Sequence, residues 1–279
     1  MALQIMEAGK IAVVEKPVAN GMAEMELLRK AREKHPGKLF FRHNRRFEAA
    51  FMKIQELIRA GVIGEPQYIK LYRSVGYCRR NDWMTMTQFH GGLLTNWGPH
   101  LIDQALQLLD SPVRGIWADV WRVISIGDGD DLFKILLTAE NGRVADIEVS
   151  GCNAMPGREM EIIGSRGTIV HESGKIRARY IDPCVELKEL QPHPENPPLE
   201  YGNFDEKLYF VESQYEAPAN TPSILETVYN EVVNGIPCPV TFEQAAEVVR
   251  VTEEAFRQGG FRRRQASSRS SASRSGTQQ

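Results

Sequence analysis

The sequence predicts an α/β unit followed by a larger α+β domain. Near the N-terminus, two short apolar runs without alternation lie on either side of an amphipathic segment, a pattern typical of buried parallel strands joined by a helix. Further along, short segments rich in β-branched and aromatic residues follow one another closely, which indicates antiparallel strands. We therefore expect a first domain over residues 1–47, a second over 48–260 and a disordered tail over 261–279.

The first apolar run predicts a strand that is buried on both faces. A short helix over residues 2–8 precedes it and ends at Gly9. The run itself covers residues 11–14, and the segment Glu15-Lys16-Pro17 ends it. Unbroken apolar runs of this length suit parallel sheets, because helices cover both faces of such sheets.

A helix and a second strand complete the predicted βαβ unit. The helix begins near Asn20, with Glu24 close to the position that a capping box requires, and it runs to about residue 34. The second strand covers residues 39–41 and ends at the polar segment 42–47. Strand, helix and strand in this order predict a parallel pair.

The second domain is predicted to combine a mainly antiparallel sheet with helices. An amphipathic helix over 48–60 opens it, and Asn141-Gly142 between two strand-like segments predicts a tight hairpin. Residues 191–203 are rich in Pro, Asn and Glu and favour a loop. Two helices follow, over 221–235 and 242–258, and they can pack back on the first domain. The strands are expected at 68–76, 115–125, 132–140, 143–152, 158–163, 167–172 and 175–182.

The composition is that of an ordinary globular protein. The 279 residues are 42% hydrophobic and 25% charged, and the formal net charge of −2 provides no overall field toward nucleic acid or a membrane surface. No run of about 18 apolar residues is present, and the N-terminus lacks the apolar core of a secretory signal. The four cysteines are widely separated, which disfavours a zinc site and favours a reducing, cytoplasmic setting.

The tail from Arg262 is rich in Arg and Ser and has no apolar periodicity. Two interpretations exist for it. Its basic residues could contact phosphate groups, or it could be a solvated end without fixed structure. The composition favours the second interpretation, because the segment has too little apolar surface to offset the entropy of ordering it.

The segment 91–103, Gly-Gly-Leu-Leu-Thr-Asn-Trp-Gly-Pro-His-Leu-Ile-Asp, is the strongest candidate for a functional site. It places Asn96, His100 and Asp103 at positions i, i+4 and i+7, which share one face of a helix. One interpretation is a buried structural histidine paired with Asp103. The other is a general acid/base at His100, oriented by Asn96. Pro99 is compatible with a helix only in the first turn and kinks it further inside.

A second candidate lies at the ends of the two predicted parallel strands. Lys16 follows the first strand directly, and Asn44 and Arg45 follow the second. Ligands of open α/β sheets bind at the carboxyl ends of the strands, so these side chains would lie at one rim. A lysine there can stabilise a hydroxyl or an oxyanion. The alternative interpretation is a set of ordinary solvated charges.

Four motifs in a fixed order carry a resemblance to a known family. They are Glu15-Lys16-Pro17 after a buried strand, Asn44-Arg45-Arg46-Phe47 after the next, the segment 91–103, and Gly164-Ser165-Arg166-Gly167-Thr168-Ile169. Over residues 8–258 the chain resembles the glucose-fructose oxidoreductase, inositol dehydrogenase and rhizopine catabolism (Gfo/Idh/MocA) family. The resemblance implies a Rossmann domain that binds NAD or NADP, here present as a partial βαβ remnant. It also implies an α+β domain with an open, mainly antiparallel sheet.

The activity that the resemblance implies is hydride transfer between NAD(P) and a hydroxyl carbon of a sugar, polyol or related small molecule. Lys16 matches the lysine that contacts both the substrate and the nicotinamide ribose. His100 matches the histidine that gives or takes the proton. Asn96 stands where many members have Asp, and it completes the catalytic set. An amide carries no negative charge to stabilise a protonated imidazole, although it can still position a hydroxyl.

Further residues are expected to bind the cofactor and the substrate. Glu15, Lys16, Pro17, Asn44 and Arg45 form the expected cofactor-binding set. The expected substrate-binding set comprises Arg80, Trp83 and Asp103. No metal site is expected.

The chain departs from the family pattern in one large respect. It contains no G-x-G-x-x-G motif, the loop that holds the pyrophosphate at a helix N-terminus. We expect a chain that starts partway through the cofactor domain, with impaired binding of NAD(P) and uncertain activity. Three hypotheses remain open: a truncated oxidoreductase, a natural short form that binds carbohydrate without redox turnover, and a chain that only pairs through its open sheet. The resemblance also implies an apolar open sheet face covered by a second subunit, hence a homo-oligomer, with no nucleic-acid or membrane partner.

Overall fold

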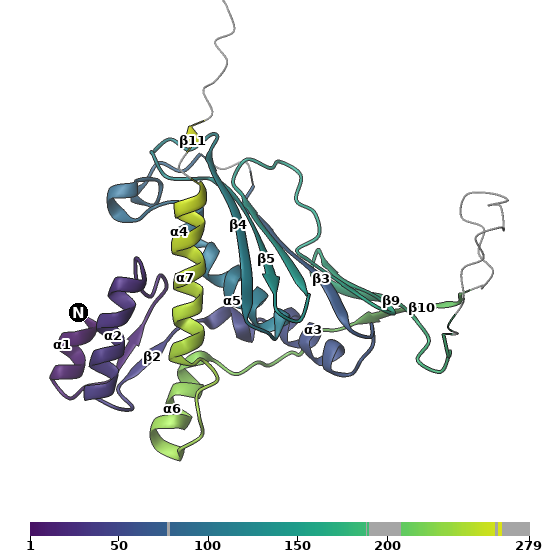
Figure 1. The fold of residues 1–279 in the computed structure, drawn as a ribbon, viewed down its shortest axis with the longest axis horizontal. Coiled ribbons are helices and arrows are strands. Elements are labelled where there is room, and N and C mark those ends of the chain that lie inside the picture. Colours follow the sequence, from purple (N-terminus) through teal and green to yellow (C-terminus); the bar gives the residue numbers. More distant parts are fainter. Residues whose placement is uncertain (77–78, 188, 190–207, 260–261, 264–279) are drawn as a thin grey trace, which may run out of the picture.

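The computed structural model describes residues 1–76, 79–187, 189, 208–259 and 262–263. Its first part is the predicted βαβ unit. The strands β1 (Ala12–Val14) and β2 (Leu39–Phe41) pair in parallel, with Ala12 opposite Leu39, and α2 (Met22–Lys34) connects them. A short helix, α1 (Ala2–Glu7), precedes β1 (Figure 1).

The start of α2 shows how local sequence and packing combine. The Glu24 carboxylate accepts a hydrogen bond from the Asn20 backbone N–H at 2.9 Å, as a capping box requires. The helix nevertheless begins two residues after Asn20, with Gly21 at the cap position. A Cβ atom at Gly21 would lie 2.5 Å from Oε1 of Glu253, so glycine permits the close approach of the C-terminal helix.

The second part is built on a nine-stranded sheet. Its strand order is β10-β9-β8-β7-β3-β6-β5-β4-β11, and neighbouring strands are antiparallel except for β3 with β6 and β4 with β11. The Asn141-Gly142 hairpin joins β5 to β6 as predicted, with φ of +87° at Gly142. The strands are β3 (Pro66–Ser74), β4 (Val113–Arg122), β5 (Leu132–Ala139), β6 (Val144–Ser150), β7 (Met160–Gly164), β8 (Gly167–Glu172), β9 (Lys175–Ile181), β10 (Phe210–Tyr215) and β11 (Arg262–Arg263).

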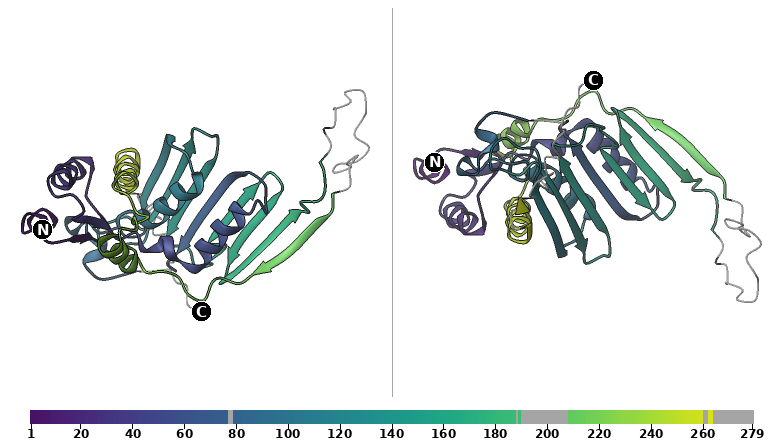
Figure 2. Two further views of the ribbon diagram at one scale, coloured as in Figure 1. Left: turned by 90° about the horizontal axis from the view of Figure 1, so that it is seen from below. Right: turned by 90° about the horizontal axis from the view of Figure 1, so that it is seen from above.

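Helices cover one face of this sheet and leave the other without a helical layer (Figure 2). The inward-facing residues alternate along each strand, as Phe133, Ile135 and Leu137 of β5 do, and all three are fully buried. They pack against α3 (Ala49–Arg59) and α5 (Gly98–Leu109). The shorter helical elements are η1 (Asn44–Phe47), η2 (Trp83–Thr85), η3 (Thr87–Phe89) and α4 (Leu93–Asn96).

The last two helices join the two parts. Residues of α6 (Ile224–Asn234) and of the first half of α7 (Phe242–Gly259) pack into the core around β1 and β2. The second half of α7 packs on β4 and into the core of the sheet domain. The domain boundaries at residues 47 and 260 stay a prediction.

Three features of the sheet domain differ from the sequence prediction. The strand β10 lies where no strand was predicted, because as an outer strand it has no buried residue to produce an apolar pattern. Arg262 and Arg263, placed by the prediction in a disordered tail, form β11 beside β4. The rest of that tail, 264–279, and the predicted loop 191–203 lie outside the described residues.

The open sheet face is the third difference, because it is not simply apolar. Lys134 forms ion pairs with Asp146 at 3.1 Å and with Glu148 at 3.4 Å, and Lys70 pairs with Glu161 at 3.5 Å. Cross-strand pairs of opposite charge stabilise an antiparallel sheet without burying its surface. Within the described residues, no helix has the length and apolar character needed to cross a membrane.

Candidate active site

The segment around His100 forms two helices in place of the single predicted one. The first, α4, ends at Asn96, and α5 begins at Gly98 with Pro99 in its first turn, where proline is tolerated. The backbone N–H of His100 bonds to the Trp97 carbonyl at 3.1 Å, three residues back. The Asn96 carbonyl therefore lacks its usual helical partner and remains available for another donor.

Lys16 supplies that donor. Its Nζ atom donates to the backbone oxygen and to the side-chain Oδ1 of Asn96, both at 2.6 Å. Partial burial and the nearby Arg45 guanidinium lower the pKa of Lys16, and Glu15 opposes this effect. The Lys16–Pro17 bond is cis. The structure thus brings together the end of β1 and the helix break before α5, which are 80 residues apart in sequence.

His100 is 8% exposed and lies beside this contact. Its Nδ1 atom is buried and has no hydrogen-bond partner among the described residues. Burial lowers the pKa of His100 to about 3, with further lowering by Lys16, Arg45, His43 and Arg73. The ring is therefore neutral at pH 7, and the nearby Lys16 ammonium group favours this neutral form.

Asp103, the third residue of the predicted face, has a different environment. It is 1% exposed and holds Arg46, itself 7% exposed, through contacts of 2.6 to 3.1 Å. Arg46 also donates to the Pro239 carbonyl and to Oε1 of Gln244, both at 2.8 Å. Because both oxygens of the Asp103 carboxylate bind Arg46, these contacts favour a structural role for Asp103. Substrate binding by Asp103 stays a prediction that no contact of this structure supports.

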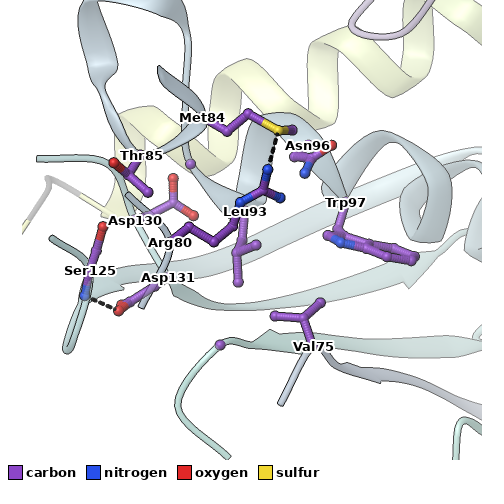
Figure 3. A pocket seen from close by; sticks show the side chains of 12 residues that line it. Val75, Arg80, Met84, Thr85, Leu93, Asn96, Trp97, Ser125, Asp130 and Asp131 are labelled. Carbon is purple, nitrogen blue, oxygen red and sulfur yellow. Dashed lines mark hydrogen bonds between the residues drawn. The ribbon is translucent and has the colours of Figure 1, made fainter. Parts of the chain in front are cut away.

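A cavity of about 280 Å³ opens next to α4 (Figure 3). Loop residues after β3, the start of α4, and the loops after β4 and β6 form its wall. Asn96 and Trp97 lie at one side and Asp130 and Asp131 at the other. The lining residues are Val75, Arg80, Met84, Thr85, Gly92, Leu93, Asn96, Trp97, Ser125, Asp130, Asp131 and Gly151.

The two acidic residues of the cavity wall are held by backbone groups. Asp131 accepts from the N–H groups of Val123, Ile124 and Ser125 at 2.6 to 2.7 Å. Asp130 accepts from the Leu94 N–H at 2.8 Å, while its Oδ1 is buried with no partner in the part of the chain that the structure describes. Burial raises the pKa of Asp130 to about 7.

The other two predicted substrate-binding residues are placed differently from each other. Arg80 lines the cavity, where it pairs with Asp82 at 2.7 Å and contacts the Met84 sulfur at 2.9 Å. Trp83 is 59% exposed and does not line the cavity. Both assignments stay predictions.

The expected cofactor-binding residues gather at the carboxyl ends of β1 and β2. Glu15 pairs with Arg42 at 2.7 Å, and Pro17 is exposed. Asn44 begins η1, three residues after the end of β2. Arg45 forms an ion pair with Glu48, and its guanidinium lies 4.3 Å from the centre of the Trp97 ring. Their role in binding is untested by these contacts.

Sequence reasoning missed two residues of this site. Arg73 lies with its guanidinium 4.9 Å from the centre of the Trp97 ring and influences His100. Its position on β3, in phase with buried Ile69 and Leu71, was the available signal, since a charged residue at an inward-facing position is unusual. Asp130 was also missed. In the described residues, no group of three His, Cys, Asp or Glu side chains is placed to hold a metal ion.

Comparison with known proteins gives consistent results. The model of the GFO/IDH/MocA C-terminal domain matches residues 51–170. The chain is 26% identical over 269 residues to scyllo-inositol 2-dehydrogenase (NADP(+)) IolW of Bacillus subtilis, which covers 90% of this chain and 70% of that protein. It is 29% identical over 200 residues to the uncharacterized oxidoreductase YrbE of the same organism, covering 69% and 57%.

A solved structure shows the same fold. The NAD-binding protein from Listeria innocua superposes with a TM-score of 0.74 at 26% identity, over 93% of this chain and 75% of that one. The described residues thus share the architecture of a larger protein. In its family-model match, its relatives and its fold, the chain is similar to oxidoreductases of the Gfo/Idh/MocA family, among them proteins named as dehydrogenases.

Proposed function

We propose that this site transfers a hydride between NAD(P) and a hydroxyl carbon of a sugar or polyol. The observation that carries the proposal is the convergence of Lys16 and His100. The ammonium group lies on the Asn96 oxygens beside the cavity, and the imidazole lies within its electrostatic reach. The names of the relatives, which include inositol dehydrogenases, support a polyol as the substrate class.

The residues present fit one end of a dinucleotide. The carboxyl ends of two parallel strands carry Lys16 and Arg45, whose positive charges suit an anionic cofactor. When bound, the nicotinamide supplies the hydride donor or acceptor. The chain has no glycine-rich loop for the pyrophosphate, so we expect this polypeptide to bind NAD(H) weakly.

The protein's own part in the reaction is to move a proton and to stabilise a charge. His100 is neutral and can take the hydroxyl proton of the substrate, and it returns that proton in the reverse direction. The Lys16 ammonium group stabilises the alkoxide that forms. Asn96 positions Lys16 through two oxygens, and the low exposure of His100 keeps water from the transfer.

Turnover and cofactor binding test this proposal in the full chain. Reduction of NADP+ or NAD+ is followed by absorbance with scyllo-inositol as the first polyol. His100→Asn should lower turnover by about 10²–10⁴-fold, and Lys16→Met should lower it comparably. His35→Asn, at the end of α2, is the matched control and should leave turnover unchanged. Equal turnover in His100→Asn and the unmodified chain contradicts the proposal. Micromolar binding of NADH in a fluorescence titration contradicts the expectation of weak binding.

A second candidate is a carbohydrate-binding protein without redox turnover. It is favoured by one observation: the described residues that line the cavity all lie between positions 75 and 151, outside the predicted cofactor-binding set. Polyol binding by calorimetry, together with no turnover under any NAD(P) condition, would select this candidate.

We also propose that the uncovered sheet face pairs with a second subunit and that the protein functions in a reducing, cytoplasmic setting. Trp117 is exposed on β4, and the described cysteines Cys152, Cys184 and Cys238 are free thiols. Light scattering of the purified chain tests the first statement.

A further inference from the structure

The surroundings of His100 are rich in positive charge. Lys16, Arg45 and Arg73 all lie close enough to lower its pKa, and no carboxylate of the described residues acts in the opposite direction. Arg45 has Glu48 as an ion-pair partner. The Arg73 side chain forms no ion pair or hydrogen bond within the part of the chain that the structure describes, and its Nε atom is buried.

Among the residues that the structure describes, Lys16 also has no anionic partner in direct contact. Both of its hydrogen bonds go to neutral oxygens of Asn96, and Glu15, the nearest carboxylate that acts on it, pairs with Arg42 at the surface. Partly burying two cations without a counter-charge costs free energy. An anion bound between them would offset that cost.

The orientation of Asn96 points to the same kind of ligand. An ammonium group can only donate, so the side-chain atom that meets Lys16 must be the carbonyl oxygen. The amide nitrogen, with two donor hydrogens, is the end left for a ligand in the cavity that Asn96 lines. A hydrogen-bond donor at this position requires an acceptor on the ligand.

The two carboxylates of the cavity wall are already bound by other groups and do not pair with Lys16 or Arg73. Three backbone N–H groups occupy Asp131. Asp130 bonds to the Leu94 N–H, and its other oxygen is buried under Gly92, where an added Cβ would lie 2.0 Å from it. Arg80 is the cation among the described lining residues, while Lys16 and Arg73 lie outside the lining and contact two residues of it, Asn96 and Trp97.

We propose that the substrate of this site is an anionic polyol, whose carboxylate or phosphate oxygens bind between Lys16, Arg73 and the Asn96 amide. The proposal rests on the proposed function, because the same site holds His100 and Lys16. A negative charge there would also raise the pKa of His100 toward the range in which an acid/base works at neutral pH.

Three ligands on one six-carbon skeleton test the proposal by isothermal titration calorimetry with the full chain. They are glucitol, which is neutral, gluconate, which carries a carboxylate, and glucitol 6-phosphate. We expect at least one anion to bind about tenfold more tightly than glucitol, with an advantage that shrinks as salt is added. The anion that shows the advantage identifies the group. Equal affinities for all three ligands, or no binding of any, would overturn the proposal.

Variants assign the effect to Arg73. Arg73→Gln should abolish the preference for the anion, Arg73→Lys should keep most of it, and Arg59→Gln, at the exposed end of α3, should not change it. A preference that survives Arg73→Gln overturns the role of Arg73. Should Arg73→Gln not fold, Arg73→Lys and the ligand series on the unmodified chain decide. Binding needs no turnover, so an anion preference without redox activity would reject the proposed function and leave this inference standing.

Discussion

Replacing Asp103 with alanine should destabilise the protein strongly. The buried Arg46 guanidinium loses its anionic partner and three nitrogen–oxygen contacts of 2.6 to 3.1 Å. Breaking a buried pair by removing one partner costs about 3–5 kcal/mol. The bonds from Arg46 to Pro239 and Gln244 remain, so we expect the lower end, about 3 kcal/mol.

Urea unfolding followed by circular dichroism measures this cost. With a slope of about 3 kcal/mol per molar, the midpoint should fall by about 1 M. Replacing both partners, as in Arg46→Met with Asp103→Leu, should cost much less than Asp103→Ala, because no charge is left buried. The surface control is Glu56→Ala, whose carboxylate pairs with Lys53 at 2.7 Å but is 61% exposed, and it should cost less than about 1 kcal/mol. A loss below about 1 kcal/mol in Asp103→Ala would refute the reasoning.

Three further outcomes concern the cavity region. The pKa of His100 is about 3 in the folded protein and about 6.5 when unfolded. Between these two pH values the unfolded chain binds one proton more than the folded chain, so the free energy of unfolding should fall as the pH drops below about 6.5. His100→Asn should remove this pH dependence, which the midpoints of urea unfolding at several pH values measure. The pKa of Asp130 is raised to about 7. Its contribution has the opposite sign, since the folded state holds the proton between about pH 4 and 7, so Asp130→Asn should remove a loss of stability as the pH rises through that window; an unchanged slope argues against the raised pKa. Gly92→Ala should lower the melting temperature markedly, because Gly92 has φ of +119° and the new Cβ would collide with Asp130; a melting temperature equal to that of the unmodified chain would contradict this.

Much of the fold follows from short-range patterns in the sequence. The alternation along β5 and β6, with Asn141-Gly142 between them, indicates both strands and the turn, because each signal lies within a few residues of its partner. The parallel pair of β1 and β2 is equally visible as two unbroken apolar runs. These elements need no information about distant segments.

The site depends on contacts that local patterns do not contain. The spacing of Asn96, His100 and Asp103 indicates a shared helix face, but it cannot show that Pro99 starts a new helix or that Lys16 takes the freed carbonyl. The partner of Asp103 is Arg46, 57 residues away, and only the packing of η1 against α5 reveals it. Local sequence patterns identify such residues but do not show which of them are in contact in the folded protein.

One long helix, α7, fixes the distance between the part of the chain that carries Lys16 and the part that carries His100. Lys16 follows β1, a strand of the small N-terminal core, and His100 lies on α5, a helix of the core under the large sheet. The helix α7 is embedded in both cores, through Phe242 near its start and Val251 and Ala255 further on. A continuous rod of 18 residues resists bending at its middle. A hinge motion between the two cores would have to bend or break α7. The distance between the His100 imidazole and the Lys16 ammonium group is therefore set when the chain folds, before any ligand binds.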